Sequence, residues 1–121
     1  MSTITAPAEI EVPRDLLPTL RENVRLGLEM LADSLSHAVC NHEPIDDICH
    51  ELELALAAHR AFAHDADAYP ADAVCFAVRY TIQDARSRIA EDHVSVDEAE
   101  LLVGRIRACE ALQTAESLVT A

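Results

Sequence analysis

A chain of 121 residues is long enough to bury a hydrophobic core without disulfides or a structural metal. Its composition, 50% apolar and 26% charged, excludes an intrinsically disordered protein, and 22 acidic residues against nine arginines give a net charge of -13. This charge argues against direct binding of nucleic acid or anionic lipid, whose phosphates it would repel, and favours a basic protein partner.

Residues that break regular structure are rare, with two glycines and five prolines, and aromatic residues make up only 3% of the chain. This composition favours long helices with a core of Leu, Ile, Val and Ala. No segment reaches the roughly 18 apolar residues that a membrane span needs, and the first residues lack the features of a secretory signal. The four cysteines form no C-x-x-C pair, so we expect reduced thiols and a cytoplasmic location.

The sequence divides into a tail and one folded unit. Residues 1–13 contain two prolines and no hydrophobic period, so we expect a flexible N-terminal tail. Residues 14–121 contain four stretches with a helical period, which predict a single domain. The first helix begins between Arg14 and Pro18, because proline fits only the first turn of a helix, and it fades near Cys40. Its apolar face is formed by Leu17, Leu20, Val24, Leu28, Leu31, Leu35 and Ala38.

Prolines also mark the starts of the second and third helices. Pro44 suits the first position of the second helix, and Pro70 opens the third helix after a polar break at residues 65–69. We expect Asp92 and His93 to close the third helix. Steps of three and four residues place Ile45, Ile48, Leu52, Ala55, His59 and Phe62 on the inward face of the second helix. The same steps place Cys75, Val78, Ile82, Ala85 and Ile89 on the inward face of the third.

The fourth helix begins with a capping box, in which the Ser95 hydroxyl and the Glu98 carboxylate accept hydrogen bonds from backbone amides of the first turn. Its inward residues are Ala99, Leu102, Ile106, Cys109 and Leu112. Short connections make consecutive helices antiparallel. The sequence therefore predicts an all-α fold, an antiparallel up-down four-helix bundle with a disordered N-terminal tail. Two long hairpins swapped into a dimer would use the same helices.

An up-down bundle would bring two acidic segments to one pole. Residues 37–51 and 88–101 contain nine acidic residues against one base, Arg88. Acidic residues in a first helical turn suit the helix dipole, but Glu91 and Asp92 lie near a helix C-terminus, where the dipole disfavours them. We therefore predict that this pole binds a partner, the alternative being that its charge only keeps the protein in solution. The predicted partner-binding residues are Glu43, Asp46, Asp47, Glu51, Glu91, Asp92 and Glu100.

The same pole would hold imidazole, thiolate and carboxylate groups, which are ligands for zinc and related metals. A metal site would draw on His37, His42, His50, His93, Cys40 and Cys49. These residues lack compact ligand spacing, so we assign no metal site and keep a metal-binding or metal-sensing bundle as an alternative. The sequence shows no glycine-rich phosphate loop and no second histidine to complete a zinc motif after His50-Glu51. We therefore expect no enzyme activity and no cofactor.

The leading hypothesis is a non-enzymatic helical module that binds a basic protein partner through its acidic pole. Antitoxins, nuclease immunity proteins and phage anti-defence proteins work in this way as classes, some of them by mimicking nucleic acid, and the analogy here is one of charge and size. Carboxylates would take the place of phosphates and pair with Arg and Lys of the partner. A third hypothesis is a structural homo-oligomer, such as a homodimer, whose acidity is incidental.

Overall fold

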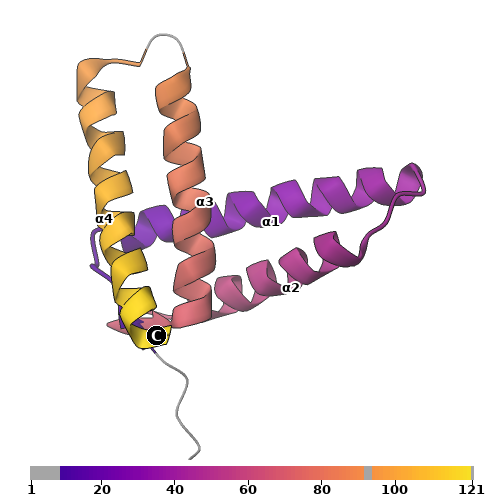
Figure 1. Cartoon of the computed structure of the whole chain (residues 1–121), viewed down its shortest axis with the longest axis horizontal. Helices are drawn as coiled ribbons and strands as arrows, with labels where there is room; N and C mark the ends of the chain where they lie inside the picture. Colours follow the sequence, from indigo (N-terminus) through magenta and orange to yellow (C-terminus); the bar gives the residue numbers. More distant parts are fainter. Residues whose placement is uncertain (1–8, 92–93, 121) are drawn as a thin grey trace, which may run out of the picture.

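The computed structural model describes residues 9–91 and 94–120, with side chains as far as residue 115. Within these ranges it contains four helices, α1 (Leu17–Cys40), α2 (Asp46–Ala61), α3 (Ala71–Ala90) and α4 (Val96–Thr120). Two short strands, β1 (Glu9–Glu11) and β2 (Ala68–Pro70), complete the order β1-α1-α2-β2-α3-α4. The predicted all-α fold of four bundled helices is confirmed (Figure 1).

The helices form two antiparallel hairpins that cross each other (Figure 1). α1 packs against α2, α3 packs against α4, and both helices of the first hairpin also pack against α3. α3 is the central helix, because it contacts all three other helices and both strands, whereas α4 packs mainly on α3. The turn between α1 and α2 and the connection between α3 and α4 consequently point away from the crossing in different directions.

Backbone hydrogen bonds fix the end of α1. The His42 amide donates to the Val39 carbonyl at 3.3 Å and the Glu43 amide donates to the Ala38 carbonyl at 2.8 Å. These are the two bonds of a Schellman motif, which satisfies carbonyls at the end of a helix. His42 takes the left-handed position of the motif, with φ of 56°, which glycine usually occupies. The chain then reverses and enters α2.

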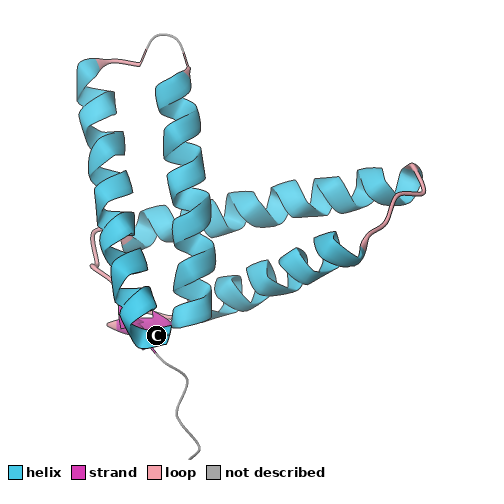
Figure 2. Cartoon of the chain, in the orientation of Figure 1, coloured by secondary structure: helices cyan, strands magenta, loops and turns pink. Residues whose placement is uncertain are grey.

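A strand pair joins the start of the chain to the connection between α2 and α3 (Figure 2). β1 and β2 are antiparallel, and Ile10 lies opposite Tyr69 with both side chains buried. This corrects the prediction that residues 9–13 belong to a tail and that residues 65–69 are only a polar break. Strands of three residues are too short to show an alternating period, so the sequence pattern could not reveal them. Residues 1–8 of the predicted tail lie outside the described residues.

The same connection is tied to α1 by hydrogen bonds. The Tyr69 hydroxyl donates to the His64 carbonyl at 2.7 Å. Arg21 of α1 donates to the Phe62 carbonyl at 2.7 Å and pairs with the Asp65 carboxylate at 2.7 Å. A guanidinium that binds the last carbonyls of a helix satisfies groups that the helix itself cannot pair. The first hairpin is therefore fastened to the start of the second.

The hydrophobic core lies where the two hairpins cross. One cluster of buried side chains draws on β1, β2 and all four helices. Its most deeply buried aliphatic members include Leu20, Val24, Val74 and Val78. Apolar residues farther along the hairpins are exposed instead, as for Met30 at 57%, Val39 at 55% and Leu101 at 56%. Each hairpin thus has a packed half at the crossing and an outer half with fewer neighbours.

Two helix predictions can be judged at single residues. The Glu98 amide donates to the Ser95 hydroxyl at 3.1 Å, so the half of the predicted capping box that Ser95 supplies is confirmed. α2 begins at Asp46, two residues later than Pro44 suggested. Its predicted inward residue His59 is exposed, and its neighbour Ala58 is buried in its place.

None of the described helices is both long enough and apolar enough to span a membrane.

Candidate functional site

The α1–α2 hairpin carries a strongly one-sided charge beyond the crossing. Residues 26–59, which we call the acidic arm, contain seven acidic residues and no arginine. All nine arginines of the chain lie outside this segment. The arm projects away from α3 and α4 over much of its length (Figure 1). Apart from Glu29 and Glu51, which pair with Arg25 and Arg79, the carboxylates of the arm have no guanidinium partner among the described residues.

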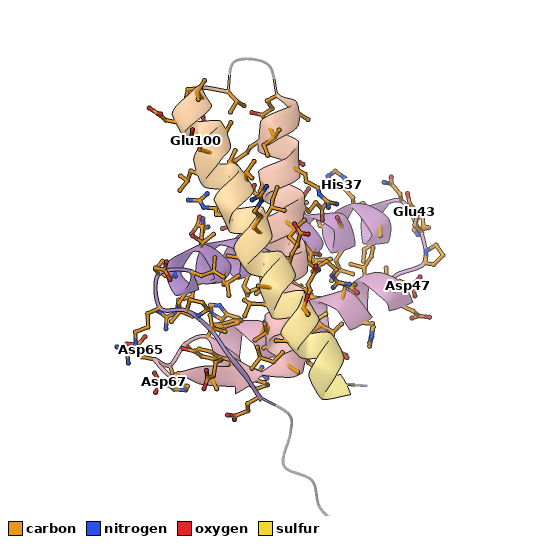
Figure 3. All side chains as sticks on the ribbon, turned by 60° about the vertical axis from the view of Figure 1, so that its left-hand side comes forward. His37, Glu43, Asp47, Asp65, Asp67 and Glu100 are labelled. Atoms are coloured by element: carbon orange, nitrogen blue, oxygen red, sulfur yellow. The ribbon has the colours of Figure 1, made fainter. Side chains whose placement is uncertain are left out.

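Three of the predicted partner-binding residues lie together at the tip of the acidic arm. Glu43 follows the Schellman motif, and Asp46 and Asp47 form the first turn of α2 (Figure 3). All three side chains are exposed and form no ion pair with any residue in the described ranges. The dipole of α2 stabilises the two aspartates, because they lie in the first turn of the helix. Ile45 at the N-cap supplies no side-chain hydrogen bond to this turn. Glu43 has no such structural role.

Glu51, the fourth predicted residue on the arm, is part of the internal packing. Its carboxylate accepts a hydrogen bond from Arg79 of α3 at 3.0 Å, and its side chain is 33% exposed. This ion pair joins α2 to the central helix near the crossing. Glu51 is thus engaged within the chain, so we remove it from the candidate partner-binding set.

The expected single acidic pole is not present, because the hairpins cross instead of running side by side. Glu91 caps the end of α3 and Glu100 lies near the start of α4, and both are exposed. They belong to the end of the second hairpin, away from Glu43 and Asp47 (Figure 3). Asp92 lies outside the described residues. The acidic residues of the two predicted segments therefore form two separate groups. The group on the acidic arm is the larger, and the arm contains no arginine.

Two further carboxylates of the arm have partners on their own helix. Glu29 pairs with Arg25 at 2.5 Å, and Asp33 lies 3.7 Å from the His37 imidazole. These side chains are at least half exposed, and surface pairs of this kind contribute about 0–1 kcal/mol. Glu29, Asp33 and Glu53 were not among the partner-binding residues predicted from the sequence. The signal that would have found them is the stretch without arginine between Arg25 and Arg60.

The residues considered as metal ligands do not converge. Among the side chains that the structure describes, no group of three His, Cys, Asp or Glu residues is placed to hold a metal ion. His37, Cys40, His42 and His50 are exposed and Cys49 is half-buried, while His93 lies outside the described residues. None of the four cysteines, all of which lie in the described ranges, forms a disulfide, and burial raises the pKa of Cys109 to about 11. The described part of the chain thus offers no support for the metal alternative.

Two grooves adjoin the crossing of the hairpins. The larger, of about 490 Å³, lies between the start of α1 and the end of α2 and is lined by Arg21, Arg25 and His59. Both arginines are already paired with carboxylates, and the hydrogen bond from Arg21 lowers the pKa of Asp65. The second groove, of about 310 Å³, lies between α1 and α3 and has Leu26, Met30 and Tyr80 in its lining.

No protein family model, curated protein or solved structure matches this chain. No function can therefore be transferred to it from a relative. Its function is inferred from the charge, exposure and geometry of its own residues.

Proposed function

We propose that this chain is a non-catalytic binding module whose acidic arm engages the basic surface of a partner protein. The observation that carries the proposal is the arm itself, with seven acidic residues, no arginine and three unpaired carboxylates at its tip. Such a surface attracts Arg and Lys side chains and speeds their association. Inhibitors of the antitoxin, immunity and phage anti-defence classes act in this way, and an arm that replaces nucleic acid phosphates is one form of it.

The shape of the arm also suits this role. A projecting hairpin presents charge on several sides and enters a concave basic site more easily than a flat surface does (Figure 1). Its acidic tip is built on a turn that backbone hydrogen bonds hold in place. Because the carboxylates start from a defined backbone, less conformational entropy is lost when they bind.

The test uses a variant in which the tip is neutralised, Glu43→Gln, Asp46→Asn and Asp47→Asn together. Proteins retained from the native source by the wild-type chain are identified, and their affinity is measured with purified components. We expect a partner with a basic surface, whose binding to the variant is about tenfold weaker at low salt and whose salt dependence is reduced.

The matched control removes three negative charges elsewhere, through Glu9→Gln, Glu11→Gln and Asp15→Asn. These residues are exposed and lie at the start of the described chain. The aspartates at the start of α2 each contribute about 0.3–1 kcal/mol through the helix dipole, so circular dichroism must show that the tip variant is folded. Equal loss of binding in both variants would mean that only the total charge matters. Unchanged binding in the tip variant would refute the proposed surface.

A further inference from the structure

The groove between α1 and α3 is apolar at its base and acidic at its edges. Leu26 and Met30 of α1 line one side, and Tyr80 of α3 lines the other. The carboxylates of Glu29 and Asp84 are also in the lining, one from each helix. Met30 is 57% exposed, so its side chain is available for contact with a ligand.

The base of the groove is fixed by the crossing of the two helices. A Cβ at Gly27 would lie 3.1 Å from the Tyr80 ring, so glycine lets the ring approach α1 more closely than another residue would without a shift of the ring. The Tyr80 ring also packs on Phe76, with the ring centroids 4.6 Å apart. Tyr80 is therefore in contact with α1 and with Phe76 before any ligand arrives. A preformed apolar base reduces the entropic cost of binding.

The polar groups of the groove include hydrogen-bond acceptors that a cationic ligand can use. The Asn23 side chain is 5% exposed, and its Nδ2 donates to the Thr19 carbonyl at 2.9 Å. Its Oδ1 has no hydrogen-bond partner among the residues that the structure describes. Glu29 and Asp84 are paired with Arg25 and Arg88 of their own helices, and exposed pairs of this kind are weak enough for a ligand to replace.

The charge around the groove selects the kind of ligand. The acidic arm continues outward from one side of the groove with seven acidic residues and no arginine. A second copy of this chain would bring another acidic arm and would be repelled at low salt. A basic amphipathic helix matches both the apolar base and the acidic edges of the groove. Its apolar side covers Leu26, Met30 and Tyr80 while its cationic flanks lie beside the carboxylates.

We propose that the α1–α3 groove is a docking site for a basic amphipathic helix of the partner, with Met30 as its apolar anchor. The inference rests on the proposed function and deepens it, since it names the structural element that the acidic protein recognises. The arm attracts the basic partner, and the groove supplies the apolar contact that charge alone does not give.

The test uses a synthetic amphipathic helix of about 18 residues, made of Leu and Lys, which is about 27 Å long. Binding is measured by fluorescence anisotropy for the wild type, for Met30→Gln and for Val39→Gln. Val39 is 55% exposed on the same helix but nine residues farther on, so it lies on the opposite face of α1. We expect Met30→Gln to weaken binding at least tenfold and Val39→Gln to leave it unchanged.

Methionine-methyl NMR gives a second measurement, made on the wild-type protein, in which the variant serves only to assign the signal. The chain contains two methionines, Met1 and Met30, so the Met30 signal is assigned by its loss in Met30→Gln. We expect the peptide to shift this signal. An unshifted Met30 signal, or equal affinity for the wild type and Met30→Gln, would overturn the proposal. Equal binding of a scrambled peptide of the same composition would do the same, because it would show attraction by charge alone.

Other outcomes separate this inference from the proposed function. If neutralising Glu43, Asp46 and Asp47 abolishes peptide binding while Met30→Gln does not, the acidic arm stands and the groove is refuted. If the peptide binds through Met30 while the partner still binds the neutralised arm, the groove stands and the proposed surface fails. A dimer in sedimentation that Met30→Gln dissociates would place a second copy in the groove and overturn the peptide proposal.

Discussion

The two glycines of this chain, Gly27 and Gly104, lie within helices but in different surroundings. Gly27 lies at the crossing of α1 and α3, where a Cβ would lie 3.1 Å from the Tyr80 ring. Gly104 lies on α4, where a Cβ would meet no atom of the described residues within 4 Å. Glycine costs a helix interior about 1 kcal/mol relative to alanine. The first glycine is explained by packing, and nothing in the structure explains the second.

This contrast predicts different effects for the same substitution. Gly104→Ala should raise the free energy of unfolding by about 0.5–1 kcal/mol, because the helix gains propensity and no atom has to move. Gly27→Ala gains the same propensity but pushes the Tyr80 ring away, so it should be less stable than Gly104→Ala by about 1 kcal/mol or more. Urea unfolding of both variants measures the difference. Equal stabilisation would show that the crossing tolerates a methyl group.

At the scale of elements, burial differs between the part of a helix at the crossing and the part beyond it. α3 is buried on several sides along residues 73–78, whereas α1 beyond Leu28 has no buried apolar residue before Ala38. Two helices packed only on each other bury less apolar surface than helices at a crossing, and local stability follows buried contacts. The outer part of the acidic arm is therefore the part of the first hairpin that opens most easily.

Hydrogen exchange should detect this difference. Backbone amides of residues 30–36 and 49–53 should exchange faster than those of residues 74–82 in α3, by about tenfold or more. Mass spectrometry of peptic fragments, produced after exchange in the native protein, provides the measurement, and the helix interior of α3 serves as the internal reference. Equal protection in both regions would mean that the arm is packed as firmly as the core. Slower exchange of the arm in the presence of a partner would identify the side that is covered.

For the whole molecule, the ion pair between Arg21 of α1 and Asp65 of the connection between the two hairpins makes stability depend on pH. The hydrogen bond and charge of Arg21 lower the pKa of Asp65 below its ordinary value of 3.8. Asp65 therefore stabilises the fold fully above that value, and this contribution is lost as the pH falls through the lowered pKa. The pair connects α1 to the segment between α2 and β2. Its loss in acid should loosen the fastening of the first hairpin.

The corresponding prediction compares acid unfolding of the wild type and Asp65→Asn. Between about pH 5 and pH 2 the wild type should lose more stability than the variant, because only the wild type must protonate this carboxylate. Thermal unfolding across this pH range measures the loss, and Asp15→Asn controls for the removal of one exposed negative charge. If Asp65→Asn follows the wild type across the range, the pair does not contribute.

The sequence was a reliable guide wherever the deciding interactions are local. Pro18 marked the start of α1 and Ser95 the cap of α4, because caps and prolines act within one helical turn. The carboxylates Glu43, Asp46 and Asp47 were selected because an up-down bundle would bring two acidic segments to one pole, and all three are exposed. The strand pair of Ile10 and Tyr69 escaped detection, since its partners are far apart in the chain and each strand is only three residues long.

By itself, then, the sequence determined four helices, their approximate ends and an excess of negative charge. Only the tertiary structure decided which charges lie together. α1 and α3 approach each other closely at Gly27, and this contact between distant residues leaves no period in the sequence. Because the hairpins cross, Glu91 and Glu100 are separated from Glu43. The acidic arm therefore replaces the single acidic pole that two hairpins lying side by side would have formed.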